Sequence, residues 1–282
     1  MGIIISVPKT NFIYSKIPAN SHTHLNYLAN LSAISSGISI ECRISEQKRI
    51  NESEELNNKI KLLKLTKINL DEEFKMIKSF PNFAQSSVSW VSIKSYYLFF
   101  NLLLIMEYLI WPDEAVFKKS HKKTMSTFVK YIKEGNIIFN KSLFNVILSC
   151  YEALNFKAKP GENLKILNVD PERRIKQTLK KIVRYKLNEL RKENNFPNFR
   201  KKKAKEKRTE LLNSDVHICE FFYWYRIRAN YWDLDFLCEQ NINSKYFVMF
   251  YENYFKLIDN LYRAFKVIIN KLAKIRLGKE IL

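Results

Sequence analysis

The scarcity of glycine restricts the possible folds of this chain more than any other feature of its sequence. Only five of the 282 residues are glycine, and they are far apart in the sequence. Loops that cradle nucleotide phosphates need closely spaced glycines, so the common glycine-rich nucleotide-binding folds are excluded. Sandwiches and barrels use glycine in many tight turns and are disfavoured. Because 46% of the side chains are hydrophobic, the chain can bury a sizeable core, and we predict an all-α fold.

Hydrophobic periodicity predicts three long helices. Residues 53–80 carry apolar side chains at three-to-four spacing, and Pro81 ends this block. Residues 85–110 are apolar around most of the helix circumference, which is typical of the central helix of a bundle. From Asn243 onward a heptad-like seam predicts a helix that packs against another helix or a second subunit. The seam consists of Phe247, Phe250, Tyr254, Ile258, Leu261, Phe265, Ile268 and Leu272.

Shorter helices are expected between these blocks. One should end near Lys133, and Asn140 resembles the N-cap of another that contains Val146 and Ile147. Asp170-Pro171-Glu172 combines an N-cap, a proline at the first helical position and an acidic first turn, so it predicts a further helix start.

Cysteine and histidine residues are scattered through the sequence. The four cysteines and four histidines lack the spacing of a zinc site or a disulfide framework, so we expect a cytoplasmic protein with no metal and no cofactor. The longest apolar run, Tyr96–Ile110, is shorter than the roughly 20 residues needed to cross a bilayer. We therefore expect a buried helix there and no membrane partner.

The net charge of +20 is concentrated in one block. Residues 164–208 contain 17 basic and five acidic residues, which favours a polyanion such as RNA as the partner. The alternative is a solvated loop whose charge keeps the protein soluble. The densest cluster of candidate nucleic-acid-binding residues is Arg200, Lys201, Lys202, Lys203, Lys205, Lys207 and Arg208.

Two arginines lie in an aromatic block that is otherwise acidic. On a helix, Arg226 and Asn230 are one turn apart on the same side, and Arg228 aligns with Tyr231. A guanidinium supplies a donor fork for phosphate, an amide can bond a ribose or a base, and a phenol offers a hydroxyl and a stacking face. The alternative is that Arg226 pairs with an acidic neighbour inside a bundle.

The order of these elements resembles the HEPN superfamily of helical bundles. The resemblance covers roughly residues 85–272: a long apolar helix containing Tyr96-Tyr97-Leu98-Phe99-Phe100, a loop with Lys119-Ser120-His121, an arginine-containing helix and a last long helix. The chain is similar to the branch that carries an Arg-x-x-x-Asp-Tyr element, matched here from Arg226 to Tyr231 with Asn230 in place of aspartate. The resemblance implies a HEPN-like bundle over 81–282 with 1–80 as an N-terminal extension, partly helical, and 164–208 as a basic helical insertion.

HEPN proteins often form homodimers, and many are metal-independent ribonucleases of toxin–antitoxin or antiviral defence systems. The family uses an arginine and a histidine four to six residues later, but no histidine follows Arg226 or Arg228 in that window. Catalysis would then need His121 or Tyr231 as the acid/base group. Tyrosine has an ordinary pKa near 10, so His121 is the better chemical match. The candidate catalytic residues are Arg226, Asn230, Tyr231 and His121, with Arg228 as a further nucleic-acid-binding residue.

Three functions remain open from the sequence. The first is an RNA- or nucleotide-engaging HEPN-like protein, in which the strip around Arg226 acts on RNA as an endoribonuclease. The second is a helical module that binds nucleic acid, a nucleotide or a partner protein and performs no chemistry. The third, a metal-dependent enzyme acting on DNA, is the least favoured because the few acidic groupings lack a two-metal layout.

Overall fold

The computed structural model describes residues 35–43, 48–140, 186–212 and 244–282, together with a few positions between these ranges. Two compact units are present: Leu31–Lys141 with Tyr225–Leu282, and Met1–Asn30 with Ser142–Trp224. This division differs from a boundary at residue 80. The isolated positions are Ser32, Val146, Ile147, Asp215, Val216, Phe222, Tyr223 and Arg226.

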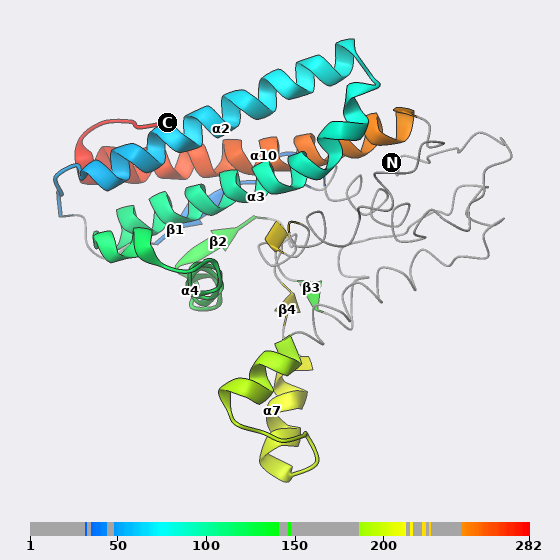
Figure 1. The fold of residues 1–282 in the computed structure, drawn as a ribbon. Helices are drawn as coiled ribbons and strands as arrows, with labels where there is room; N and C mark the ends of the chain where they lie inside the picture. The colour runs from blue at the N-terminus through cyan, green and yellow to red at the C-terminus, as the bar shows by residue number, and fades with distance from the viewer. Residues whose placement is uncertain are drawn as a thin grey trace, which may run out of the picture. The chain divides into compact units, whose positions relative to one another are not determined.

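Three long helices form the centre of the larger unit. They are α2 (Glu54–Ser79), α3 (Phe83–Ile110) and α10 (Ser244–Leu277), and α3 packs against both of the others (Figure 1). All three were predicted from periodicity, within one or two residues at the ends that the sequence indicated. About 75% of the described residues are helical, so the predicted all-α fold is confirmed.

Local signals explain where α2 begins and ends. The Ser53 hydroxyl accepts a hydrogen bond from the Leu56 backbone N–H at 3.2 Å, and Glu54 and Glu55 lie at the positive end of the helix dipole. The helix stops at Ser79, two residues before Pro81, because the residue before a proline is biased away from helical conformation.

Helix α3 is the core of the unit. From Tyr96 to Ile110 every residue is buried except Tyr97, which is 40% exposed. The helix is long and apolar enough to cross a membrane, but 76% of its most apolar window is buried inside the protein. Its apolar surface is covered mainly by α2 and α10, as the all-round hydrophobicity predicts.

A buried polar network ties the three helices together. Glu73 of α2 is 8% exposed and accepts hydrogen bonds from Lys94 Nζ of α3 at 3.0 Å and from the Tyr251 hydroxyl of α10 at 2.8 Å. Burial and the Glu73 carboxylate raise the pKa of Tyr251, so its phenol stays protonated and donates.

After α3 come a short 3₁₀ helix, a further α-helix and a strand. A short 3₁₀ helix, η1 (Glu114–Lys118), contacts α3 and leads into α4 (His121–Lys133), which packs on α3 beside it. Strand β2 (Ile137–Phe139) then pairs antiparallel with β1 (Ile40–Cys42), with Ile40 opposite Phe139. The predicted helix ending at Lys133 is confirmed.

The predicted helix after Asn140 is wrong at the positions that the structure describes. Asn140 instead lies beside β1, where its side chain accepts from the Ser39 N–H at 2.8 Å and donates to the Gly37 carbonyl at 3.1 Å. Val146–Ile147 form strand β3, which pairs antiparallel with β4 (Asp215–Val216). Both are β-branched residues that suit a strand when a partner is present. The predicted helix start at 170–172 lies outside the described residues.

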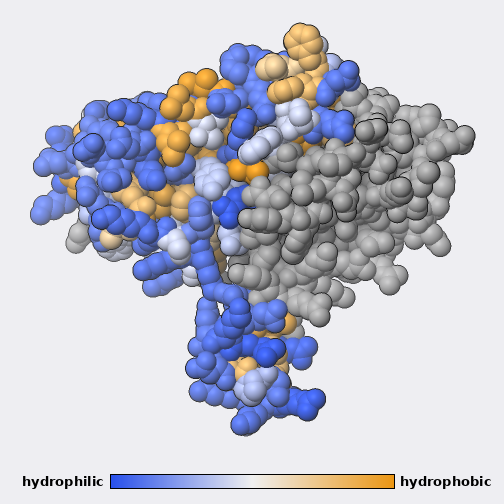
Figure 2. Space-filling model, viewed as in Figure 1, coloured by the Kyte–Doolittle hydropathy of each residue, from blue (hydrophilic) through white to orange (hydrophobic). Residues whose placement is uncertain are grey.

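Two described segments of the basic block are helical. Residues 186–193 are helical, and α7 (Lys202–Leu212) follows after a turn. All seven basic residues between 200 and 208 are exposed, and Ala204 is the one buried residue among the described side chains of α7. Figure 2 shows the surface over α7 as mostly hydrophilic.

Candidate functional site

The clearest cluster of chemically useful side chains lies where the start of α4 meets the middle of α3. Tyr96 and Tyr97 come from α3, His121 is the first residue of α4, and Arg226 reaches the same place from a segment far along the chain. All four belong to the larger compact unit.

Capping interactions place His121. The Ser120 hydroxyl is the N-cap of α4 and accepts from the Lys123 N–H at 3.3 Å. Just before it, Lys119 donates to the buried carboxylate of Glu107 on α3 and forms an ion pair with it. This pair fastens the chain to α3 immediately before the histidine.

The His121 imidazole is packed among three aromatic rings. Its Nδ1 shares a hydrogen bond of 2.7 Å with the Tyr96 hydroxyl. The ring centroid lies 4.2 Å from Phe100, 5.4 Å from Tyr96 and 5.9 Å from Tyr97. A histidine held by one ring nitrogen in this way has a fixed orientation and keeps Nε2 for another partner.

Arg226 lies over the same tyrosine pair. Its Nη1 donates to the Tyr97 hydroxyl at 3.3 Å. The guanidinium carbon is 4.8 Å from the centroid of the Tyr96 ring and 5.7 Å from that of Tyr97, which is cation–π geometry. These rings and this phenol are uncharged groups that help to hold the arginine side chain in place.

The electrostatics of the cluster favour a neutral histidine. Burial and the nearby charge of Arg226 lower the pKa of His121 below its ordinary value of 6.5. The imidazole is therefore uncharged at neutral pH and can accept a proton. Lys122 and Lys123 are exposed in the same first turn of α4, so the surroundings are electropositive.

The structure brings two of the predicted catalytic residues together. Arg226 and His121 meet on the tyrosine pair, although the distance between them could not be inferred from the sequence. Asn230, Tyr231 and Arg228 lie outside the described residues.

The roles of Tyr96 and Tyr97 in this cluster could not be predicted from the sequence. The available signal was a pair of hydroxyl-bearing rings in a helix that is otherwise almost entirely apolar. The exposure of the Tyr97 side chain depends on how the helices pack, and no sequence pattern indicates it.

A metal centre is not formed by the part of the chain that the structure describes, since no group of three or more His, Cys, Asp or Glu side chains converges there. The chemistry that this cluster offers is proton transfer and anion binding by side chains. The basic residues of the block 200–208 belong to the other compact unit.

Comparisons with known protein families, with curated proteins and with solved structures find no match for this chain.

Proposed function

We propose that this chain is a HEPN-like, RNA-engaging protein that cleaves RNA without a metal, with Arg226 and His121 as its catalytic pair. The observation that carries the proposal is the meeting of a neutral imidazole and a guanidinium on one tyrosine pair. A proton acceptor and a phosphate-binding cation side by side are what transesterification of RNA requires.

His121 fits the role of general base. With its Nδ1–H donated to the Tyr96 oxygen, the lone pair on Nε2 takes the proton of a ribose 2′-hydroxyl as that oxygen attacks the adjacent phosphorus. The bond from phosphorus to the 5′-oxygen breaks, and this oxygen takes a proton from the imidazolium. The products are a 2′,3′-cyclic phosphate end and a 5′-hydroxyl end.

Arg226 and Tyr97 fit the role of substrate contacts. A guanidinium offers paired donors to the two non-bridging phosphate oxygens, whose negative charge grows during the attack. The 40% exposed ring of Tyr97 offers a stacking face for a base of single-stranded RNA. The exposed Lys122 and Lys123 add attraction for the backbone.

The basic residues Arg200 to Arg208 fit a separate, sequence-independent attraction of RNA. All seven are exposed on or just before α7, and each one that neutralises a phosphate releases a counterion. This contribution raises affinity and is independent of the chemical step.

The test is cleavage of end-labelled, mixed-sequence RNA in EDTA by the wild type and by single variants. We expect His121→Asn to lower the cleavage rate by about 10² to 10⁴ and Arg226→Ala by about 10². Tyr96→Phe should shift the pH profile of cleavage because it removes the partner of Nδ1. The cyclic phosphate end is identified by its resistance to phosphatase.

A matched control is Tyr108→Phe, a tyrosine buried elsewhere on α3 and stacked on Phe117. It should leave the cleavage rate unchanged, and thermal unfolding should show each variant folded. Intact RNA that is retained in an Arg226-dependent manner would identify a non-catalytic binding module and refute the cleavage step. Retention that is indifferent to Arg226 would refute the whole site.

The HEPN resemblance also leads us to propose a homodimer. Sedimentation velocity of the purified chain at several concentrations checks this, and a mass of 33.6 kDa at every concentration would contradict it.

A further inference from the structure

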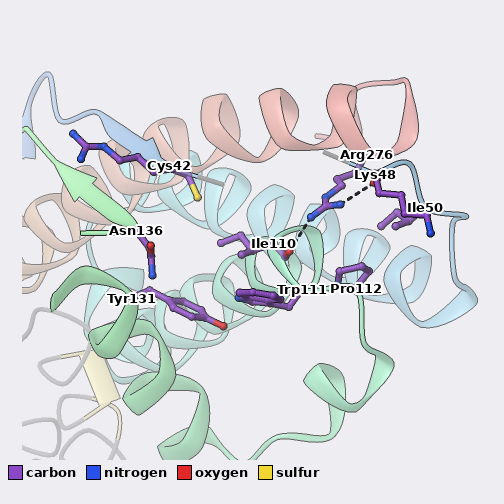
Figure 3. Close-up of a pocket in the computed structure, with 10 residues that line it drawn as sticks. Cys42, Lys48, Ile50, Ile110, Trp111, Pro112, Tyr131, Asn136 and Arg276 are labelled. Atoms are coloured by element: carbon purple, nitrogen blue, oxygen red, sulfur yellow. Dashed lines mark hydrogen bonds between the residues drawn. The ribbon is translucent and has the colours of Figure 1, made fainter. Parts of the chain in front are cut away.

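A second candidate site lies at the C-terminal end of α3. Here a cleft of about 260 Å³ is lined by the end of β1, the segment before α2, the end of α3, and parts of α4 and α10 (Figure 3). Ile110 in its wall is fourteen residues beyond Tyr96, which is about 21 Å along a helix. The cleft is therefore separate from the tyrosine, histidine and arginine cluster.

A buried arginine forms one wall of this cleft. Arg276 of α10 is 4% exposed, and its guanidinium donates to the carbonyls of Leu109 at 3.0 Å, Ile110 at 3.0 Å and Lys48 at 2.8 Å. These acceptors are neutral dipoles, and no carboxylate of the described residues pairs with Arg276. The positive charge is thus held in a fixed orientation without being cancelled by an ion pair.

Two further cations line the cleft. Arg43 is exposed at the end of β1, and Lys48 is exposed just before α2. The lining residues include no carboxylate. Glu107 and Glu134, two described carboxylates whose charges act on the lining residue Tyr131, already have partners: Glu107 pairs with Lys119, and Glu134 pairs with Lys130 at 3.6 Å.

The remaining polar lining groups are uncharged at neutral pH. Burial raises the pKa of the Cys42 thiol to about 11. Burial and nearby carboxylates raise the pKa of Tyr131 to about 12, so its hydroxyl is available as a donor. Three cations and no carboxylate among the residues that line a partly enclosed space favour an anion of more than one charge.

Aromatic rings also line the cleft and offer a stacking surface beside the cations. Figure 3 shows Trp111 and Tyr131 along one side of the cleft, with Cys42 across from them and Arg276 beside Ile110. Trp111 is 57% exposed although it directly follows the core helix, so a flat ligand can reach its face. A ligand in which a planar ring is joined to a phosphate can contact both the aromatic rings and the cations of this lining.

We propose that this cleft binds a mononucleotide, with the phosphate held by Arg43, Lys48 and Arg276 and the base stacked on Trp111. The volume is just below the lower end of the range for small-molecule sites, about 300 Å³, which suits a single nucleotide unit. This site goes beyond the proposed cleavage of RNA, and its test does not depend on that activity.

The test is isothermal titration of the full chain with AMP, with adenosine and with inorganic phosphate. AMP should bind more tightly than either fragment, because each fragment engages half of the lining. We expect Lys48→Gln to weaken AMP binding about tenfold and Trp111→Ala about five- to 100-fold, the range seen for loss of one stacked base.

Matched controls use residues of equal exposure outside the cleft. Trp90→Ala removes a 56% exposed tryptophan from the first half of α3, and Lys64→Gln removes an exposed lysine of α2. Both should bind AMP as the wild type does. Equal effects of Trp90→Ala and Trp111→Ala, equal binding of adenosine and AMP, or no heat with AMP at millimolar concentration would each overturn the proposal.

The nucleotide could be free or could be the end of an RNA chain, and competition separates these sources. A trinucleotide with a 5′-phosphate that displaces AMP, while its 5′-hydroxyl counterpart does not, identifies a chain end as the ligand. Failure of both trinucleotides identifies the free mononucleotide. His121→Asn should bind AMP normally, so loss of RNA cleavage and loss of this site are distinguishable.

Discussion

A histidine that is packed among aromatic rings has a different pKa from a histidine on the protein surface. His121 has Tyr96, Tyr97 and Phe100 around it and a guanidinium nearby, so protonation would bring a second cation into a poorly hydrated place. The tyrosines orient both His121 and Arg226, since one binds the imidazole nitrogen and the other accepts from the guanidinium. The reactivity of this residue is thus set by its neighbours.

This environment predicts a pH dependence of stability. In the unfolded chain His121 takes up a proton near its ordinary pKa of 6.5, whereas in the folded chain its pKa is lower. Between these two values the unfolded state binds more protons, so the free energy of unfolding falls as pH decreases from about 7. Urea unfolding at several pH values should show this fall, and His121→Asn should flatten it. A variant curve parallel to the wild type would contradict the lowered pKa.

At the scale of elements, the ends of the helices are secured by side chains from elsewhere in the fold. Arg276 of α10 supplies the donors for the last carbonyls of α3, and a positive charge at a helix C-terminus is also favoured by the helix dipole. These hydrogen bonds connect the C-terminal ends of α3 and α10.

Loss of this cap should be costly. Arg276→Ala leaves two buried carbonyls of α3 and the carbonyl of Lys48 without this donor, so we expect a loss of about 3 kcal/mol in the free energy of unfolding. The control is Arg263→Ala on the same helix, whose side chain is 76% exposed and pairs with Asp259. It should cost less than about 1 kcal/mol. Equal losses in urea unfolding would contradict the capping role.

Neighbouring glutamates on α2 offer a second comparison. Glu73 is buried with Lys94 and Tyr251, whereas the side chain of Glu72 is 63% exposed and pairs with Lys75 on the same helix. We expect Glu73→Ala to destabilise the fold by about 3 kcal/mol, because it leaves a partly buried lysine and a buried phenol without their acceptor. Glu72→Ala should change stability by less than about 0.5 kcal/mol. Chemical denaturation of both variants measures the difference.

At the scale of the whole molecule, the net charge of +20 governs encounters with polyanions. The seven exposed bases between residues 200 and 208 form its densest part, and they contribute little to burial. Their removal should therefore affect binding and leave stability almost unchanged.

Salt dependence checks this assignment. Replacement of Lys201, Lys203, Lys205 and Lys207 by glutamine should reduce the slope of log affinity against log salt for RNA by about 3, since each phosphate contact contributes about 0.7 to 0.9. The control replaces Lys61, Lys64, Lys266 and Lys271, which are exposed on α2 and α10. Equal reductions in both proteins would indicate a diffuse charge effect and contradict a localised site.

Much of the helical architecture could be predicted from the sequence. The limits of α2 follow from Ser53 and Pro81, and the central position of α3 follows from its all-round hydrophobicity. The described members of the seam on α10 are buried inside the unit, so the seam packs against another helix of the same chain. These features depend on interactions within a few residues or on composition along one helix.

Features with distant partners could not be predicted in this way. Val146–Ile147 carry no helix-breaking signal, and their strand exists because Asp215–Val216 lies beside them. The sequence by itself determined the helices, the charged block and the candidate residues, because periodicity, caps and charge are local properties. Only the tertiary structure decided that His121 meets a tyrosine 25 residues away and that Arg226 meets one 129 residues away, because those contacts depend on how helices pack.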